Sequence, residues 1–561
     1  MSIQSDYVII GAGINGMVAA ARLAGAGYSV TLLDERDRLG GFIDSGELTV
    51  PGFVHDTFSS WHPLFVASPA YAELGAELHA QGLTYRNTEG PVTASIDVSP
   101  GGGERAVIGY RDPGQTAAAF RHEDDRAAYA RMLDELGARS GTVFGTLGSE
   151  LRSKKALGLV WSALRNGLGP AEQFARDSLM SGRNFTSLRF NGWEADQLWT
   201  PWLLHAGLAP DHATGGAMLP LMALTMHSFG LPVVEGGARN FVTAFERLLR
   251  SRGVRIELGL PVDRIIVRDG RADAAETVFE RFEARYGVLA STSPHELYRN
   301  LLPASAIPSA VRDQASTHRS GRAAMQIHLA LDTPPAWNDV RLAQVPLVHL
   351  SNGSGSTGIA CAQAEAGVLP ASPTVVVGQQ CVLDPTRAPE GKATLWIQLQ
   401  ELPFRPTGDA AGELDVGQGW TPWLATAYAE RVVNRIEPFA PGLRSSVLGI
   451  KVLSPADLRA ANRNAVHGDP YGGSAELYQN LLWRPFPAGA RHRTHLAGLW
   501  HLGAATHPGP GLGGGSGYLV SEQILAEGRR RLPGRRRPPA TVSAHPASWG
   551  ASAGEDLVEV S

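Results

Sequence analysis

The sequence DYVIIGAGINGMVAAARLAGAGYSVTLLDERDRLGG, residues 6–41, decides the fold of this chain. Its apolar run at residues 7–10 is typical of a buried strand, and alanine and leucine recur at helical spacing over residues 16–25. Gly27 ends the predicted helix, and residues 29–33 form a second run of strand type. The segment therefore predicts a strand, a helix and a second strand near the start of the chain.

Three glycines follow the first predicted strand in the pattern G-x-G-x-x-G, at Gly11, Gly13 and Gly16. The first permits a tight turn, the second lets a pyrophosphate approach the backbone, and the third lets the helix pack closely on the strand. The helix N-terminus then directs its free N–H groups at the phosphates. Asp34 ends the second strand, where a carboxylate can accept both ribose hydroxyls. Together these features predict a dinucleotide site.

The residues from Asp34 onward indicate which dinucleotide binds. A carboxylate at this position repels the 2′-phosphate of NADP, which leaves FAD and NAD. In the continuation DERDRLGGF, Gly40 and Gly41 follow the acid after a short basic stretch. That pattern resembles the two-dinucleotide-binding-domain flavoproteins, where this segment covers the FAD. We therefore expect FAD.

A second G-x-G-x-x-G occurs at Gly353, Gly355 and Gly358, after the apolar run VPLVHL. Only about eight helix-compatible residues follow it, and no carboxylate ends a second strand about 20 residues on, as the fingerprint requires. We interpret this stretch as a surface loop. The sequence accordingly predicts no built-in NAD(P)H site.

The composition excludes several classes of function. The chain has 561 residues, 43% of them apolar, and its 50 basic and 54 acidic residues give no overall field for nucleic acid. Cys361 and Cys381 are too few for a disulfide framework or a metal site, and no C-x-x-C is present. No apolar run reaches the roughly 20 residues of a membrane span. The expected location is the cytoplasm.

The rest of the chain alternates between helical and strand patterns. Helices are predicted around residues 124–137, 151–166 and 217–228, and residues 237–292 read as a helix followed by four strands with the turn RDGR between two of them. Alternating runs between residues 320 and 480 predict an antiparallel sheet. The Pro-, Ala- and Ser-rich residues 531–561 are predicted to be disordered.

The stretch GAATHPGPGLGGGSGY, residues 503–518, lies between a predicted strand and a predicted helix. Glycine at this density costs conformational entropy, so the stretch needs a structural or functional reason. In FAD proteins of this architecture the chain returns at its C-terminus to complete the cofactor site. We expect glycine here because larger side chains would collide with the flavin, and we expect the following helix N-terminus to face the flavin N1/O2 edge.

These motifs together resemble the phytoene desaturase (carotenoid oxidoreductase) family of flavoproteins, in its bacterial NAD(P)/FAD-dependent oxidoreductase branch. Further along, PGFVHDTFSSWHPLFVASPAY, WLLHAGLAPDHATGG, LPVVEGGARNFVTAF, DPTRAPEGKATLW and DPYGGSAELYQNLLWRPFP carry the same resemblance, which covers the chain except for its tail. Two features depart from the family pattern: Gly513, where carotenoid desaturases often carry proline, and the Arg-rich tail. These two departures bear on which substrate the protein takes, and not on whether it binds a flavin.

The resemblance implies an α/β fold, with a Rossmann-like FAD-binding domain and an α+β substrate domain built on an antiparallel sheet. The FAD-binding domain is predicted to be discontinuous, with residues 1–70, 230–300 and 490–530, and the substrate domain comprises residues 71–229 and 301–489. The implied FAD contacts are Gly11, Gly13, Asn15, Gly16, Asp34, Glu35, Arg36, Gly40, Gly41, Val262, Gly503, Ala504, Leu512, Gly513 and Gly514.

A flavin that oxidises a C–C bond takes a hydride at N5 while a proton leaves the neighbouring carbon. His55, His62 and His507 are the candidate catalytic residues, because two follow the FAD segment and the third lies in the glycine loop. Each could instead hydrogen-bond the loop backbone. His205 resembles a satisfied helical histidine, and the tryptophans Trp193, Trp199 and Trp202 could line a lipophilic pocket or pack in the core.

The leading hypothesis is therefore an FAD-dependent oxidoreductase that dehydrogenates a lipophilic, isoprenoid- or polyene-like substrate, with oxygen, a quinone or a redox partner as electron acceptor. A flavin-dependent isomerase of a similar substrate is an alternative. A second alternative is a prenyl-protein escort-like fold without FAD, which the intact phosphate loop argues against. The helical pattern RSKKALGLVWSALRNGL could touch a membrane surface through Lys154 and Lys155, or pack as an ordinary amphipathic helix.

Overall fold

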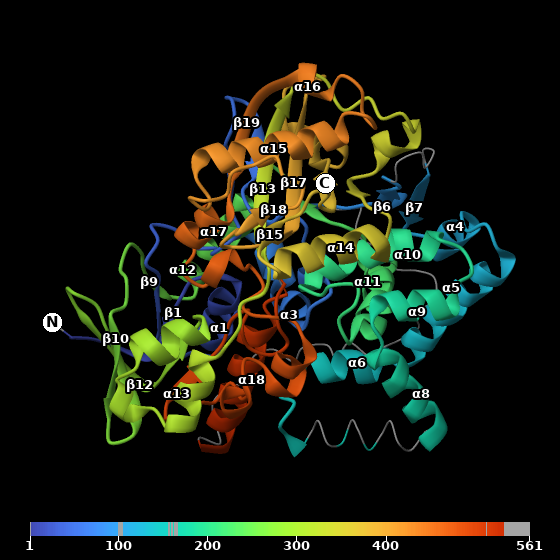
Figure 1. The fold of residues 1–561 in the computed structure, drawn as a ribbon. Helices are drawn as coiled ribbons and strands as arrows, with labels where there is room; N and C mark the ends of the chain where they lie inside the picture. Colours follow the sequence, from blue (N-terminus) through green and yellow to red (C-terminus); the bar gives the residue numbers. More distant parts are fainter. Residues whose placement is uncertain are drawn as a thin grey trace.

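The computed structural model describes residues 2–98, 105–154, 158, 161, 167–511 and 513–531. Two large sheets organise the described chain (Figure 1). In this view the first sheet lies at the lower left, where β1, β10 and β12 are labelled, and the second stands above it with β13, β17 and β19. The helices between α4 and α11 lie at the right of the same view. Both the α/β class and the antiparallel character of the second sheet were predicted.

Segments from three distant parts of the chain build the first sheet. Its strand order is β10-β11-β12-β1-β2-β9, with β20 paired to β12. The strands β1, β2, β9, β12 and β20 run parallel, whereas β10, β11 and β12 form an antiparallel meander. The strands are β1 (Ser2–Ile10), β2 (Val30–Leu33), β9 (Arg255–Glu257), β10 (Arg264–Arg268), β11 (Arg271–Glu276), β12 (Arg281–Ala290) and β20 (Leu499–His501).

Local sequence signals explain several of these elements. The helix α1 (Ile14–Gly25) connects β1 to β2, as the opening segment predicts. The RDGR turn joins β10 to β11 with positive φ at both Asp269 (48°) and Gly270 (72°). Two successive left-handed residues form the turn that suits the twist of a two-residue hairpin, and Asp-Gly is a preferred pair there.

Helices cover both faces of the first sheet. One core contains residues of α1, α3 (Pro69–Ala80), α12 (Arg239–Ser251) and α18 (Gly515–Arg531). The core on the other face includes residues of α13 (Ser309–Ser316). The helices α3 and α13 therefore belong to this layer, although the predicted boundaries at residues 70 and 300 place them in the substrate domain. Their apolar residues resemble those of any core helix, so the sequence alone does not assign them to a layer.

The second sheet has the order β19-β13-β17-β16-β14-β6-β7. Its neighbouring strands are antiparallel except for β6 and β14, which are parallel. The helix α15 (Pro422–Ile436) packs on one face with Leu424, Tyr428 and Val432 in the core. The strands are β6 (Pro91–Ile96), β7 (Ala106–Tyr110), β13 (Ala323–Leu331), β14 (Leu347–Leu350), β16 (Val375–Gly378), β17 (Ala393–Leu402) and β19 (Val447–Leu453).

The helices α5 (Glu123–Ala138) and α11 (Gly215–Phe229) occur where the sequence predicts them. Most of the predicted helix at 151–166, including Lys155, and the tail from residue 532 lie outside the described residues. None of the helices in the described parts of the chain combines the length and the apolarity that crossing a membrane requires.

The second glycine motif is not the surface loop that we expected. Gly353 caps α14 (Ser354–Glu365), a helix of 12 residues that directly follows β14. The Asp196 carboxylate accepts hydrogen bonds from the backbone N–H (2.8 Å) and hydroxyl (3.0 Å) of Ser354 at this helix start. Because a carboxylate of the protein itself already covers the helix N-terminus, it would repel a phosphate there.

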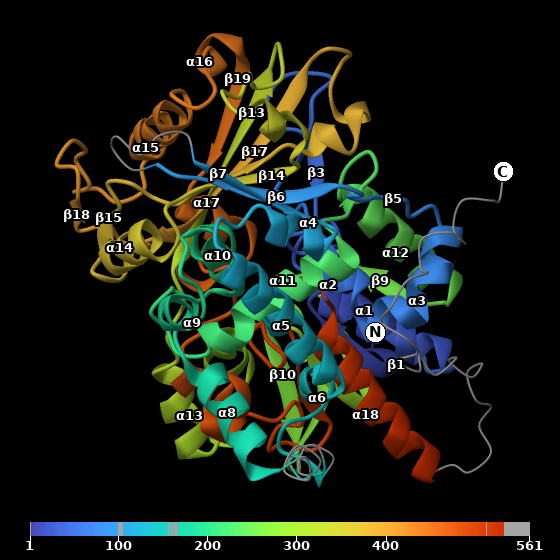
Figure 2. The same ribbon diagram turned by 90° about the vertical axis from the view of Figure 1, so that its right-hand side faces the viewer.

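The two ends of the described chain meet where α18 runs beside α1 (Figure 2). The Asn15 side chain accepts a hydrogen bond from the Gly517 N–H (3.0 Å). A Cβ at Gly517 would lie 2.0 Å from the Asn15 carbonyl oxygen, so only glycine permits this approach. Arg22 on α1, almost fully buried, reinforces the contact through ion pairs of 2.8 Å with Glu73 and Glu522.

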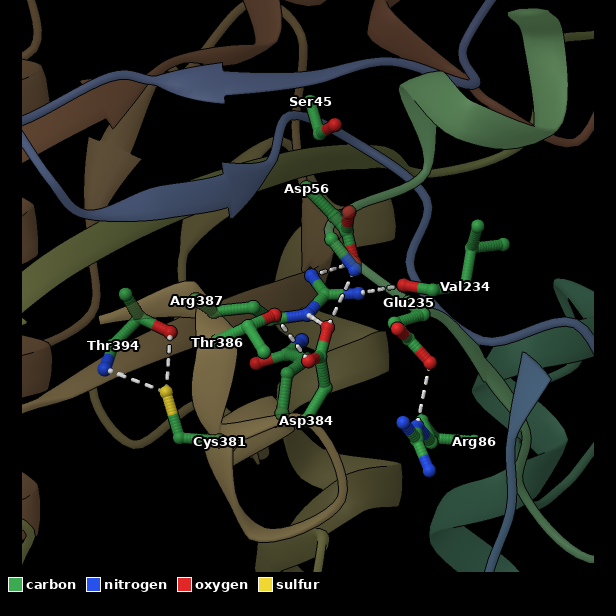
Figure 3. A network of polar contacts seen from close by, with 12 residues as sticks. Ser45, Asp56, Arg86, Val234, Glu235, Cys381, Asp384, Thr386, Arg387 and Thr394 are labelled. Carbon is green, nitrogen blue, oxygen red and sulfur yellow. Dashed lines mark hydrogen bonds and ion pairs between the residues drawn. The ribbon is translucent and has the colours of Figure 1, made fainter. Parts of the chain in front are cut away.

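A buried ion cluster connects the second sheet to the helices that cover the first sheet (Figure 3). The Arg387 guanidinium donates to Asp56 (2.7 Å), to Asp384 (3.0 Å) and to the Val234 carbonyl oxygen (2.7 Å). The three charged side chains are at most 1% exposed. Asp56 also accepts the Ala238 N–H (2.7 Å) at the start of α12. A turn after β16 is thereby fixed to the helical layer of the first sheet.

Glu401 on β17 gives the fold a pH dependence. The side chain is fully buried, and burial raises its pKa to about 7 although its carboxylate accepts the Thr374 N–H (3.1 Å). A folded pKa above the unfolded value means that stability is greatest below the unfolded pKa and is lost as the pH rises toward 7. Above that pH the folded state must hold a buried charge.

We therefore expect Glu401→Gln to be more stable than the wild type at pH 8, by about 3 kcal/mol, because glutamine replaces a buried carboxyl group whose pKa is raised to about 7. At pH 4.5 the two proteins should differ little, since glutamine keeps the acceptor for Thr374. Urea unfolding at both pH values measures this. An equal effect at the two pH values would contradict the assignment.

Candidate active site

The three glycines of the first motif occupy different environments. Gly11 has a φ of 94°, in the left-handed region that favours glycine. A Cβ at Gly16 would lie 2.0 Å from the Gly11 carbonyl oxygen, so glycine is needed for α1 to pack on the end of β1. A Cβ at Gly13, in contrast, would meet no atom within 4 Å. Gly13 therefore faces open space, where the motif places a pyrophosphate.

The start of α1 is available to an anion. Gly13 is its N-cap residue, no side chain caps the helix, and its first turn has no acidic residue. Asp34 lies nearby, where its carboxylate accepts the backbone N–H of Ala12 (2.6 Å) and of Arg36 (2.9 Å). Burial raises the pKa of Asp34. The carboxylate thus fixes the phosphate loop and keeps lone pairs for a ribose.

A cavity of about 110 Å³ lies beside this turn. The predicted contacts that line it are Gly11, Gly13, Asp34, Glu35, Arg36, Gly41 and Val262. Asn462, Arg463 and Asn464 complete its wall, and Arg463 pairs with Glu35 at 2.8 Å. Residues far apart in the sequence therefore form one cleft of the kind that a nucleoside needs.

A larger cavity of about 290 Å³ continues from the first, since both are lined by Gly13, Gly41, Ser291, Thr292, Asn462 and Asn464. Among the predicted contacts, its lining includes Gly13, Asn15, Gly40, Gly41, Gly503 and Ala504. Gly503 follows β20, has a φ of 117° and donates its N–H to Ser516 (3.1 Å). The C-terminal strand therefore delivers its loop to the junction of the two cavities.

Several glycines of the C-terminal loop and of α18 pack closely against other parts of the chain. A Cβ at Gly514 would lie 2.8 Å from Val18, and one at Gly511 would lie 2.6 Å from Leu64. Gly16, Gly513 and Gly514 line neither cavity, and Leu512 lies outside the described residues. Close packing thus accounts for the glycines at 514 and 517, whereas Gly511 packs against Leu64 and also lines the larger cavity.

The lining of the larger cavity combines aromatic side chains with the amide side chains of glutamines. Trp61, Trp202 and Trp396 line it, together with Gln326 and Gln400. The three indole N–H groups and the two amide oxygens are buried without a hydrogen-bond partner among the described residues. Of the predicted tryptophans, Trp202 is a lining residue, whereas Trp199 and Trp193 pack in or against the helical core.

None of the three candidate catalytic histidines lines either cavity. His55 hydrogen-bonds Thr49 (2.8 Å), His62 hydrogen-bonds Tyr85 (2.9 Å), and Nε2 of His507 lies 3.2 Å from the Thr146 carbonyl oxygen. Burial lowers the pKa of His55 to about 4, of His62 to about 3 and of His507 to about 4. This placement favours the alternative interpretation, in which these histidines support the surrounding chain.

His205 is the histidine that the structure places in the lining of the larger cavity, on the 3-10 helix η1 (Thr200–Ala206). Its Nε2 lies 3.2 Å from Nε2 of His349, and burial lowers its pKa to about 3. Asp469 also lines the cavity and accepts backbone N–H groups from Gly321, Tyr471 and Gly473, each at 2.7 Å. Burial raises the pKa of Asp469.

The sequence analysis missed the polar lining of β17. In LWIQLQEL, residues 395–402, Trp396, Gln398 and Gln400 alternate with apolar residues, so they share one face of the strand. Polar residues on one side of a strand normally indicate a face in water. The burial of Trp396 and Gln400 shows that this face is instead covered, and the three side chains form part of the wall of the larger cavity.

An FAD molecule fits this arrangement. The uncapped start of α1 and the open space at Gly13 suit a diphosphate, the smaller cavity suits the adenosine, and the larger cavity lies beyond them. Residues 9–77 match the family model described as an NAD(P)-binding Rossmann-like domain. That match covers the phosphate loop and the acid at the end of β2.

Similarity to known proteins extends over nearly the whole chain. The pyridine nucleotide-disulfide oxidoreductase domain-containing protein 2 of Mus musculus is 25% identical, with 93% of this chain and 94% of that protein covered. The 4,4′-diapophytoene desaturase (4,4′-diaponeurosporene-forming) of Staphylococcus aureus strain COL is 23% identical, with 90% and 95% covered. The chain is an FAD-dependent oxidoreductase that is similar to proteins of the phytoene desaturase type.

The predicted resemblance to the phytoene desaturase family is accordingly confirmed, and so is FAD as the cofactor of this oxidoreductase. The structure of wild-type putrescine oxidase bound to putrescine has the same fold, with a TM-score of 0.60, 18% identity, and coverage of 94% of this chain and 100% of that one. In this FAD-dependent oxidoreductase, the two continuous cavities therefore provide a nucleotide cleft and a space beside it.

Proposed function

We propose that the protein introduces a double bond into a lipophilic, isoprenoid- or polyene-like molecule. The observation that carries this proposal is the continuity of the nucleotide cleft with a cavity lined by Trp61, Trp202, Trp396, Met222 and Met226. Aromatic and thioether side chains provide large apolar contact area. The similarity to a protein named 4,4′-diapophytoene desaturase supports dehydrogenation of such a substrate.

Bound FAD supplies an acceptor for a hydride at N5 of its ring system. The residues of the chain position the substrate and exclude water, and they receive the proton that the neighbouring carbon loses as the double bond forms. Among the described lining residues, Asp469 is suited to accept that proton, because burial raises its pKa, whereas burial lowers the pKa of His205. The two electrons then leave to oxygen, a quinone or a redox partner.

Anaerobic mixing of the FAD-loaded protein with a panel of linear isoprenoids, both hydrocarbons and alcohols, tests the proposal. We expect the flavin absorbance to bleach as one molecule of product with an added double bond forms for each flavin. Conversion that needs pre-reduced FAD and leaves the redox state unchanged would instead identify an isomerase. A protein that stays colourless after incubation with FAD would contradict the proposal and favour an escort-like role.

A further inference from the structure

One face of the second sheet forms a polar strip in the larger cavity. Gln326 on β13 lies directly opposite Gln398 on β17, and Gln400 lies two residues further along the same strand. All three line the cavity. The other face of β17 carries Ile397 and Leu399, which pack in the core under α15. A buried sheet face can thus be built from apolar residues here, yet the cavity face is built from amides.

Hydrogen bonds within the chain orient two of these amides. The Gln326 Nε2 donates to the Phe58 carbonyl oxygen (3.0 Å), and the Gln400 Nε2 donates to the Tyr471 hydroxyl oxygen (2.8 Å). The amide oxygens of Gln326 and Gln400 have no partner among the described residues, and both side chains are at most 3% exposed. Two oriented acceptors therefore belong to the lining of the cavity.

Donors accompany these acceptors. The indole N–H groups of Trp61, Trp202 and Trp396 are buried and also lack a partner among the described residues. A buried donor or acceptor left unpaired costs about 1–3 kcal/mol. A hydrocarbon in this cavity would displace water and satisfy none of these groups. A hydroxyl group can donate to a glutamine oxygen and accept from an indole N–H at once.

The charge of the lining favours a neutral group over an ammonium. Asp469 is the one carboxylate among the described lining residues of this cavity, and its oxygens already accept three backbone N–H groups. A buried cation needs a counter-ion that is free to pair with it. The cavity has a volume of about 290 Å³, and the predicted FAD contacts Gly40, Gly41 and Gly503 also line it, so the flavin takes part of this space. It therefore encloses only a compact part of the substrate.

We infer that the substrate carries a hydroxyl group, which the Gln326–Gln400 strip binds while the apolar remainder contacts the tryptophans. This inference rests on the proposed function and narrows its substrate class to isoprenoid- or polyene-like alcohols. Gln326 and Gln400 are specificity residues in this assignment, since the hydroxyl donates its one hydrogen to either amide oxygen and accepts from an indole N–H. Unfunctionalised hydrocarbon polyenes are excluded as substrates because they leave the strip unpaired.

The test compares geranylgeraniol, its deoxy hydrocarbon and its amine in the same detergent, added to the FAD-loaded full-length protein. Binding is followed by the change in the flavin absorbance spectrum under anaerobic conditions. We expect the alcohol to bind about 100-fold more tightly than the hydrocarbon, because several buried groups gain partners. Equal binding, no binding of the alcohol, or tighter binding of the amine would each overturn the inference.

Substitutions at Gln326 and Gln400 test whether these two glutamines cause the preference for the alcohol over the hydrocarbon. Gln326→Met and Gln400→Met keep the length of each side chain and remove the amide, so each should lower the alcohol-to-hydrocarbon ratio about 10-fold. Ile359→Leu, an apolar change at an exposed residue that lines neither cavity, should leave the ratio unchanged. A ratio unaffected by both glutamine variants would contradict the assignment. The wild-type comparison of the three ligands decides the inference even where a variant fails to fold.

The inference and the proposed function fail in different ways. If the alcohol binds more tightly but reduces no flavin, the hydroxyl preference stands and the dehydrogenase function is contradicted. If the hydrocarbon reduces the flavin as fast as the alcohol, the dehydrogenase function stands and the inference is overturned.

Discussion

The Gly13→Val variant is expected to fold and to lose FAD. The backbone of Gly13 (φ −68°, ψ 177°) is open to any residue, and a Cβ there meets no atom within 4 Å. The valine methyl groups would occupy the space that both cavities share at this residue. Because this is where the phosphate loop must approach a pyrophosphate, FAD affinity should fall at least about 100-fold. The flavin absorbance of the purified variant measures the loss.

Gly90→Val is the matched control. A Cβ at Gly90 also meets no atom within 4 Å, but the residue lines neither cavity, so this variant should retain its flavin. Circular dichroism should show the same folded state for both variants. Recovery of Gly13→Val with a full complement of FAD would refute the assignment of the phosphate site.

The second large effect is expected for Arg387→Met, which should destabilise the protein by about 3–5 kcal/mol. The substitution leaves Asp56 and Asp384 buried beside each other without their counter-ion, and it removes the donor to the Val234 carbonyl oxygen. The urea concentration at which the protein unfolds should fall accordingly. The substitution should also loosen the position of Ser60, which lines the larger cavity. The Ser60 hydroxyl donates to Asp56 (2.5 Å), and Asp56 loses its ion pair with Arg387.

Two further variants test whether the loss of stability comes from the burial of this cluster and not from the loss of an ion pair alone. Arg250→Met breaks the exposed pair with Glu246 and should cost less than about 1 kcal/mol. Adding Asp384→Asn to Arg387→Met should restore part of the stability, because one of the two stranded charges is removed. A loss for Arg387→Met no larger than that for Arg250→Met would mean that the cluster does not hold the layers together.

The sequence alone predicts the features that depend on neighbouring residues. Gly11, Gly13 and Gly16 act within one turn, so their spacing indicates their separate geometries before any tertiary structure is known. The same holds for the helix α5 and for the Asp269–Gly270 hairpin, whose patterns are complete within a few residues. The dinucleotide site follows from these local signals, whereas FAD and the fold class were implied by the resemblance to known flavoproteins, and both are confirmed.

The cavity lining could not be predicted in the same way. Gln326, Gln400, His205 and Asp469 meet only because strands, a 3-10 helix and loops far apart in the sequence converge. His62 and His507 looked better placed because they are adjacent in sequence to the cofactor segments, yet their side chains are turned into the surrounding protein. The start of α14 was misread for a related reason, since its partner Asp196 is more than 150 residues away.

The contact between α1 and α18 constrains how this protein is made. Domains generally fold as they emerge during synthesis, N-terminal parts first. Here β1 and α1 emerge at once, but β20 and the glycines that contact α1 are translated almost 500 residues later. During synthesis, α1 therefore lacks the C-terminal residues that pack against it until β20 and α18 have been made. A truncation before residue 499 would leave α1 and β12 without these contacts, and we expect such a chain to bind FAD poorly.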